Sequence, residues 1–290
     1  MISLVCGSAN AEFYPTQDVK PIVLMLIDSS GSMEYDVTGY GSETGDNDIA
    51  AVPPCTDTYQ IGFGYRKSRF VVAQEVIAGT YKNYWCSYDD RSSPPSREDK
   101  DYPVKHIIPK SHGYALPEQN PDGLIDLNID RFKFGLMTFD TDPGVGSGKG
   151  GGYSYGNESP VNYGARNHNA PTGQFVKPSH SDDNATVLLK NLEVQSALLN
   201  AIPFGGTPVS PMLQDAKHFF LTDDDFLPFN QNNGKGDPYY ECRSKNIILI
   251  TDGRANLGEN ADGYPYSIVS ADQLYNIGVK VYVVGYQLSP

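Results

Sequence analysis

The sequence predicts an α/β fold in which helices flank a doubly wound, mostly parallel sheet. Two fully apolar runs, residues 22–27 and 247–250, each lead into an acidic residue and a turn, as parallel strands buried on both faces do. Segments with helical spacing alternate with the strand-like runs, which favours crossover connections between parallel strands. With 290 residues, of which 39% are hydrophobic, the chain can bury one large core.

The remaining elements follow from local patterns along the chain. Phe132 to Phe139 alternates in character and predicts a strand, and residues 280–285 predict another short, buried strand. Helices are expected over residues 69–84, 185–200, 209–221 and 266–277. We expect Thr207 to be the N-cap of the third helix, with Pro208 at its first helical position.

Long polar insertions, rich in turn residues and tyrosine, separate these elements. We expect one domain over residues 12–290, with insertions at about 34–66, 87–128 and 141–183. The glycine-rich part of the third insertion lacks the Gly-Lys-Ser/Thr ending of a phosphate-binding loop, so we interpret it as a surface loop. The tyrosines would either form a binding rim or pack the loops themselves.

Oxygen-bearing side chains gather where the predicted buried strands end. Asp28, Ser30 and Ser32 follow the first apolar run in an Asp-x-Ser-x-Ser pattern, and Asp252 follows the second. Thr207 adds a hydroxyl at a predicted helix start. Open α/β sheets bind ligands at the carboxyl ends of their strands. Carboxylates and hydroxyls are ligands that Mg²⁺ prefers, and so few protein charges leave positions for water or an outside acidic group. The sequence therefore predicts a divalent-cation site.

The order Asp28, Ser30, Ser32, Thr207, Asp252 resembles the metal-ion-dependent adhesion site of von Willebrand factor A domains. This resemblance implies a von Willebrand A or Rossmann-like fold and one divalent cation, Mg²⁺ in preference to Mn²⁺ or Ca²⁺. It implies that the first Asp and the two Ser hold the ion, that the Thr binds it directly or through water, and that the second Asp acts through water. Taken singly, each motif is also typical of an ordinary turn or cap. The three motifs in this order favour the metal site.

A closer resemblance is to the amino-terminal domain of PilY/PilC-type tip adhesins of type IV pili. It rests on Gly-Gly-Thr-Pro-Val-Ser-Pro at 205–211, Asp-Pro-Tyr-Tyr-Glu-Cys at 237–242 and Thr-Asp-Gly-Arg-Ala-Asn at 251–256. It implies an exported protein of the cell surface, pilus tip or periplasm, whose cation binds a protein or surface ligand offering an acidic group, with minor pilin subunits as further partners. The β-propeller of that family has no counterpart here, so we expect either a fragment or a short relative.

Charge and motif content argue against other classes of function. The 22 basic and 35 acidic residues give a net charge of −13, which opposes binding to nucleic acid or anionic membrane surfaces. No apolar stretch approaches the roughly 20 residues that span a bilayer. The histidines form no His-Glu-x-x-His pair, and Ser30 lies in Asp-Ser-Ser-Gly and not in a Gly-x-Ser-x-Gly elbow, so we expect no enzyme and rank a metal-dependent hydrolase last. The main alternative is a structural or assembly component of a pilus or surface filament, with a purely structural metal.

The amino terminus and the cysteines indicate export. Residues 1–11 end in Ala-Asn-Ala and are interpreted as the remnant of a signal peptide that begins upstream, with a disordered terminus as the alternative. Cleavage there would remove Cys6 and leave Cys55, Cys86 and Cys242, of which two can pair in an oxidising compartment. The sequence leaves the pair open. Cys55 with Cys86 is preferred because they flank the first predicted helix.

Two acidic segments, residues 122–128 and 222–225, carry clustered side-chain oxygens that suit calcium. Neither follows the spacing of an EF-hand loop. We interpret both as solvated turns or helix ends and leave them out of the candidate site.

Overall fold

A computed structural model of the chain describes residues 19–34, 69–81, 119–139, 174–201, 207–253, 255, 258–260 and 264–286. Its centre is a five-stranded sheet with the order β3-β2-β1-β4-β5. The strands are β1 (Ile22–Ile27), β2 (Lys133–Thr138), β3 (Phe175–Val176), β4 (Lys245–Thr251) and β5 (Val279–Gly285). Only the pairing of β2 with β3 is antiparallel in this sheet.

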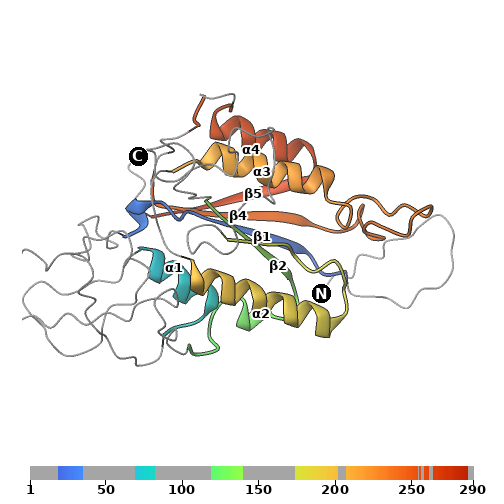
Figure 1. Ribbon diagram of the computed structural model, residues 1–290, viewed down its shortest axis with the longest axis horizontal. Coiled ribbons are helices and arrows are strands. Elements are labelled where there is room, and N and C mark those ends of the chain that lie inside the picture. The colour runs from blue at the N-terminus through green and yellow to red at the C-terminus, as the bar shows by residue number, and fades with distance from the viewer. Residues whose placement is uncertain are drawn as a thin grey trace, which may run out of the picture.

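The described helices cover both faces of the sheet, α1 and α2 on one side and α3 and α4 on the other (Figure 1). They are α1 (Arg69–Ala78), α2 (Asn184–Asn200), α3 (Val209–Thr222) and α4 (Ser267–Asn276), together with the 3-10 helices η1 (Gly31–Glu34) and η3 (Asp126–Asn128). The predicted fold class, a doubly wound and mostly parallel α/β sheet of the von Willebrand A or Rossmann-like kind, is thereby confirmed. None of the described helices is long and apolar enough to cross a bilayer.

Strand β1 explains why its sequence is apolar at every position. It lies between β2 and β4, and its alternate side chains enter two different cores. Val23, Met25 and Ile27 pack on the side of α1 and α2, whereas the intervening residues pack on the side of α3 and α4. A central strand that is buried on both faces has no solvent-facing position for a polar side chain.

Strands β2 and β5 correct the sequence predictions in opposite directions. All six residues of β2 are buried, so the expected alternating burial is wrong; β2 also contributes to both cores. Residues 280–285 form a strand as predicted, but within β5 only Val279 is fully buried, and Tyr282 is 53% exposed. In the described sheet, β5 is the outermost strand beside β4, and this position explains its exposure.

Two predicted helix ends also shift. Helix α1 ends at Ala78 rather than near residue 84, because Gly79 follows with φ at +109°, a conformation that stops a helix. At α3 the N-cap is Pro208 and not Thr207, and no side chain caps this helix end. The short antiparallel strand β3 falls within the insertion expected at 141–183 and was not predicted. Most of the three predicted insertions lies outside the described residues.

Candidate metal centre

The candidate site lies where β1 and β4 end, and the register of the two strands creates it. Ile27 pairs with Ile250, so the next residues, Asp28 and Thr251, come out side by side. The backbone N–H of Asp28 donates to the carbonyl of Ile250 at 2.8 Å, which continues the strand pairing by one residue. On the other side, Ser29 Oγ accepts the backbone N–H of Phe139 at 3.0 Å and ties the same turn to the end of β2.

Asp28 is a fully buried carboxylate whose two oxygens are held by neutral donors. Its Oδ1 accepts the backbone N–H of Ser30 at 2.8 Å, and its Oδ2 accepts the hydroxyl of Thr251 at 2.6 Å. Burial raises the pKa of Asp28 to about 6, because the loss of solvation outweighs these hydrogen bonds, and the negative charge of Asp252 adds to the rise. Each oxygen retains a lone pair beyond the one used here, so Asp28 can still ligate a cation.

A chain of side-chain hydrogen bonds joins the first motif to the last one. Ser30 Oγ and Ser32 Oγ lie 3.0 Å apart, and Ser32 Oγ donates to Asp252 Oδ1 at 2.8 Å. Residues separated by more than two hundred positions therefore form one cluster. The structure thus brings together Asp28, Ser30, Ser32 and Asp252, which are four of the five residues predicted from the sequence to form the metal site.

The fifth residue, Thr207, is buried immediately before α3. The start of α3 lies at the end of the sheet where β4 finishes: a side-chain carbon built at Gly258, shortly after β4, would lie 2.6 Å from Pro211 Cγ in the first turn of α3. Figure 1 likewise shows α3 beginning toward the end of the sheet where β1 and β4 finish and running back along the face of the sheet. Thr207 is therefore at the predicted edge of the sheet, although it is not the N-cap of the helix.

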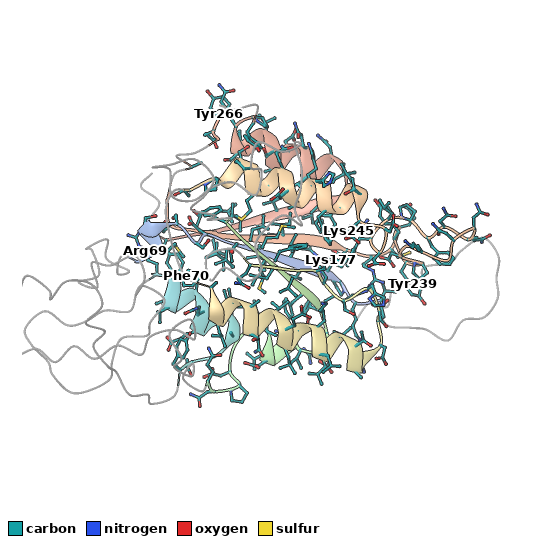
Figure 2. All side chains as sticks on the ribbon, in the orientation of Figure 1. Arg69, Phe70, Lys177, Tyr239, Lys245 and Tyr266 are labelled. Carbon is teal, nitrogen blue, oxygen red and sulfur yellow. The ribbon has the colours of Figure 1, made fainter. Side chains whose placement is uncertain are left out.

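Arg69 is a site residue that sequence reasoning missed. It is the first residue of α1, and its Nη1 donates to Asp252 Oδ2 in an ion pair whose side chains are 8% and 0% exposed. Figure 2 labels Arg69 beside η1, at the end of the sheet where β1 finishes. No local pattern indicates this contact, because the sequence shows only an arginine at the start of an apolar helix. Thr251 was also missed, although it lies next to the nominated Asp252.

The donor set fits a hard divalent cation. It consists of two buried carboxylates and the neighbouring hydroxyls, all oxygen atoms, which suits Mg²⁺ or Mn²⁺ with positions left for water or an outside ligand. The guanidinium of Arg69 shows that this edge of the sheet already accommodates positive charge beside Asp252. Among the described residues, no three or more His, Cys, Asp or Glu side chains form a group that could hold a metal. The candidate site has only two carboxylates, and its other oxygen atoms belong to hydroxyl groups.

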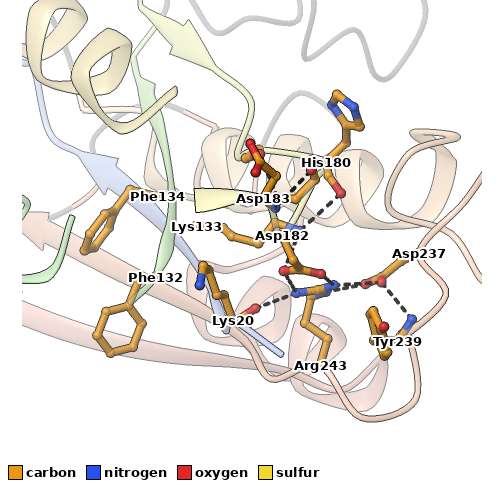
Figure 3. Close-up of polar contacts among 12 residues, drawn as sticks. Lys20, Phe132, Lys133, Phe134, His180, Asp182, Asp183, Asp237, Tyr239 and Arg243 are labelled. Atoms are coloured by element: carbon orange, nitrogen blue, oxygen red, sulfur yellow. Dashed lines mark hydrogen bonds and ion pairs between the residues drawn. The ribbon is translucent and has the colours of Figure 1, made fainter. Parts of the chain in front are cut away.

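A second buried polar cluster surrounds Arg243 at the opposite end of the strands, where β1, β2 and β4 begin (Figure 3). We call it the Arg243 clamp, and it consists of Lys20, Lys133, Asp182, Asp237 and Arg243. Arg243 donates to Asp237 from Nε at 2.5 Å and from Nη2 at 2.9 Å. It donates to Asp182 from Nη1 at 2.8 Å and from Nη2 at 2.6 Å, and to the carbonyl of Lys20 from Nη1 at 2.6 Å.

These contacts use all five N–H donors of the guanidinium, so the Arg243 clamp is internally satisfied. Lys133 Nζ adds an ion pair to Asp182 at 3.3 Å. The neighbouring Cys242 is disulfide-bonded, with its partner outside the described residues. The preferred pair, Cys55 with Cys86, likewise lies outside them. The clamp therefore joins the starts of β1 and β2 to the segments before α2 and β4, and it stabilises this end of the fold.

The two acidic segments considered for calcium have protein partners for several carboxylates. Asp122 accepts both the backbone N–H and the hydroxyl of Thr80, each at 2.7 Å. Asp126 accepts Gln195 Nε2 at 2.7 Å. Asp223 pairs with Lys177 at 2.8 Å. These contacts agree with turns and helix ends stabilised from within the chain.

A scan against models of protein families finds no match, and a search of curated proteins finds no relative. Among solved structures, the chain is similar to proximal thread matrix protein 1 from the mussel byssus, with a TM-score of 0.36, 14% identity and coverage of 92% of this chain and 38% of that one. It is also similar to the manganese-loaded TRAP protein of Plasmodium vivax, with a TM-score of 0.32, 12% identity and coverage of 94% and 59%. The open conformation of the pilus adhesin SpaC from Lactobacillus rhamnosus GG gives a TM-score of 0.35, 13% identity and coverage of 92% and 24%.

The chain spans less than two thirds of the length of each of these proteins, and similarity at these identities concerns the fold alone. The fold and the donor set together define a doubly wound α/β domain that carries an oxygen-lined site at the carboxyl edge of its sheet.

Proposed function

We propose that this chain is a metal-dependent adhesion domain of the von Willebrand A kind. One observation supports it above all: two sequence motifs far apart along the chain meet as one hydrogen-bonded cluster of Asp28, Ser30, Ser32 and Asp252 at the edge of the sheet where such folds bind ligands. When bound, a divalent cation would supply a strong positive charge with open coordination positions, suited to an acidic group of a partner.

Each residue of the proposed site would have its own role in binding the ion. Asp28, Ser30 and Ser32 would hold the ion, with Thr207 binding directly or through water and Asp252 acting through water. The hydroxyl ligands keep the negative charge around the ion low, which favours bridging to a partner over the activation of water. We therefore propose a binding module and not an enzyme.

We further propose that the domain belongs to an exported protein related to PilY/PilC-type pilus tip adhesins. The supporting residues are those of 205–211, 237–242 and 251–256. The partner would be a protein or surface ligand that offers an acidic group, with minor pilin subunits among the candidates.

The first test is calorimetric titration of Mg²⁺, Mn²⁺ and Ca²⁺ into chelator-stripped protein. Wild type should bind about one ion per chain, as one octahedral or near-octahedral site requires. Asp28→Ala should remove this binding while circular dichroism remains unchanged. Asp130→Ala is the matched control, because Asp130 is an exposed aspartate in the turn before β2, at the other end of the strands. Wild-type binding by the Asp28→Ala protein would refute the site.

A second test separates adhesion from a purely structural metal. The metal-loaded protein is passed over beads that carry carboxylate groups and over beads in which these groups are capped as amides. An adhesion site predicts retention on the carboxylate beads alone, and its loss with chelator. If chelation lowers the melting temperature but retention is equal on both kinds of bead, the metal serves only the fold.

A further inference from the structure

The ion pair between Arg69 and Asp252 lies inside the proposed metal centre. Asp252 Oδ1 accepts the hydroxyl of Ser32, and Asp252 Oδ2 accepts Arg69 Nη1. Both oxygens of this carboxylate thus already have a protein donor, and one of the donors is positively charged. Both side chains of the ion pair are buried, so solvent screens the charge of the guanidinium only weakly.

A divalent cation that uses this carboxylate, directly or through water, meets the positive charge of Arg69 at short range. Charges of the same sign a few ångströms apart in a buried site disfavour each other strongly. Without the guanidinium, the charges of Asp28 and Asp252 balance a divalent cation. With the guanidinium in place, adding the ion leaves an excess of positive charge.

The position of Arg69 on α1 ties this effect to the body of the fold. Arg69 opens α1, and the next residue, Phe70, is fully buried in the core between this helix and the sheet, as is Ile77. The backbone of the helix start is therefore fixed, while the long arginine side chain has several rotatable bonds between this backbone and the guanidinium. Such a side chain allows the guanidinium to move when an ion binds, while the backbone stays in place.

We propose that Arg69 is an internal counter-ion that competes with the divalent cation for Asp252. It stabilises the metal-free site by neutralising a buried carboxylate, and it lowers the affinity of that site for metal. This inference rests on the proposed function, because it presumes a cation at Asp28 and Asp252. It adds a residue outside the five-residue motif that sets how tightly the ion is held.

The test compares wild type with Arg69→Gln and Arg69→Lys by titration of Mn²⁺ and Mg²⁺ into chelator-stripped protein. Removing the charge should tighten metal binding at least about tenfold, as expected when a nearby like charge in a buried site is lost. Lysine keeps the charge but lacks the planar fork that pairs with a carboxylate, so its affinity should lie between the other two. Arg131→Gln is the matched control, because it removes an exposed arginine before β2, at the far end of the strands.

The melting temperature without metal gives a second readout. Arg69→Gln should melt below wild type, because Asp252 loses its positively charged partner, and it should gain more degrees from saturating Mn²⁺ than wild type does. Equal metal affinity of folded Arg69→Gln and wild type would overturn the role of Arg69 and leave the metal site intact. Absence of binding by both proteins would refute the metal site itself. If Arg69→Gln does not fold, Arg69→Lys decides the matter, and an unchanged affinity refutes the competition.

Discussion

Thr251 Oγ1 donates to Asp28 Oδ2 over 2.6 Å, so the last residue of β4 holds the carboxylate that follows β1. Thr251→Val keeps the shape of the side chain but removes this hydroxyl. The buried Oδ2 of Asp28 then loses a hydrogen-bond donor. We expect a loss of about 1–3 kcal/mol in the free energy of unfolding, typical of a buried polar group that loses its partner. We also expect weaker Mg²⁺ binding, because Asp28 loses its orientation. Urea unfolding and calorimetry measure the two effects.

Thr138→Val is the control for Thr251→Val. Thr138 is a buried threonine at the end of the neighbouring strand β2, and its hydroxyl accepts the backbone N–H of Gln174 at 2.7 Å. This variant should also lose stability but should bind metal with the affinity of wild type. Equal metal affinity in both variants would contradict the orienting role of Thr251.

Replacing Arg243 with Met should be among the most destabilising single changes in the described part of the chain. Asp182 and Asp237 would remain as buried carboxylates without the guanidinium that satisfies them. Breaking such a buried pair costs about 3–5 kcal/mol. Urea unfolding checks the loss, with Arg131→Met as an exposed arginine control. If the variant remains folded, its metal affinity should match wild type, because the Arg243 clamp and the metal centre lie at opposite ends of the strands.

Acid should weaken the Arg243 clamp through Asp182. Burial alone would raise the pKa of Asp182, but hydrogen bonds and charge from Arg243, with a further contribution from Lys133, outweigh it and lower this pKa below its usual value of 3.8. A pKa that is lowered in the folded state stabilises the fold above the unfolded value, and this stabilisation disappears as the pH falls through the lowered pKa. Unfolding free energies measured from pH 2 to pH 7 should therefore fall less steeply with acid in Asp182→Asn than in wild type.

The exposed variant Asp130→Asn provides the background slope for this pH series. Identical slopes for Asp182→Asn and wild type would show that the ion pair with Arg243 does not contribute to acid sensitivity.

Alanine substitutions at Gly79 and Gly278 distinguish the cost of a strained backbone from the cost of a steric clash. Gly79 has φ at +109°, and a side-chain carbon there would lie 2.0 Å from the carbonyl oxygen of Asn120. Gly278 has φ at +82°, but nothing lies within 4 Å of the same position. Both alanine variants should lose about 1 kcal/mol or more from the backbone conformation alone, and Gly79→Ala should lose clearly more. Thermal unfolding of the two variants measures the difference, and equal losses would contradict the clash.

Burial on both faces is visible in a sequence, and this is why the two central strands could be predicted. β1 and the apolar part of β4 show no polar position that would face solvent. The same reasoning failed for β5, whose residues 281–284 read Val-Tyr-Val-Val, because the place of a strand at the outside of the sheet is not a local property. It failed for β2 in the other direction, since its Lys133 looks solvent-facing but is buried in the Arg243 clamp.

The candidate site shows the same division between local and distant information. Asp28, Ser30 and Ser32 share one turn, so their proximity follows from the motif. The contacts of Thr251 and Arg69 depend on strand register and on where α1 begins, which no short pattern encodes. The binding of a metal at these residues remains a prediction.

The pairing of β1 with β4 also constrains the order in which the chain folds. β1 starts at Ile22, yet one of its two neighbours in the sheet starts at Lys245 and pairs with it residue by residue. During synthesis, β1 therefore cannot pair with β4 until more than two hundred further residues have been made. Contacts between such distant segments slow folding, because a long loop must be closed before any of them is gained. A nascent chain stopped before residue 245 should expose the apolar edge of β1, and chaperones that bind such segments would engage it at that stage.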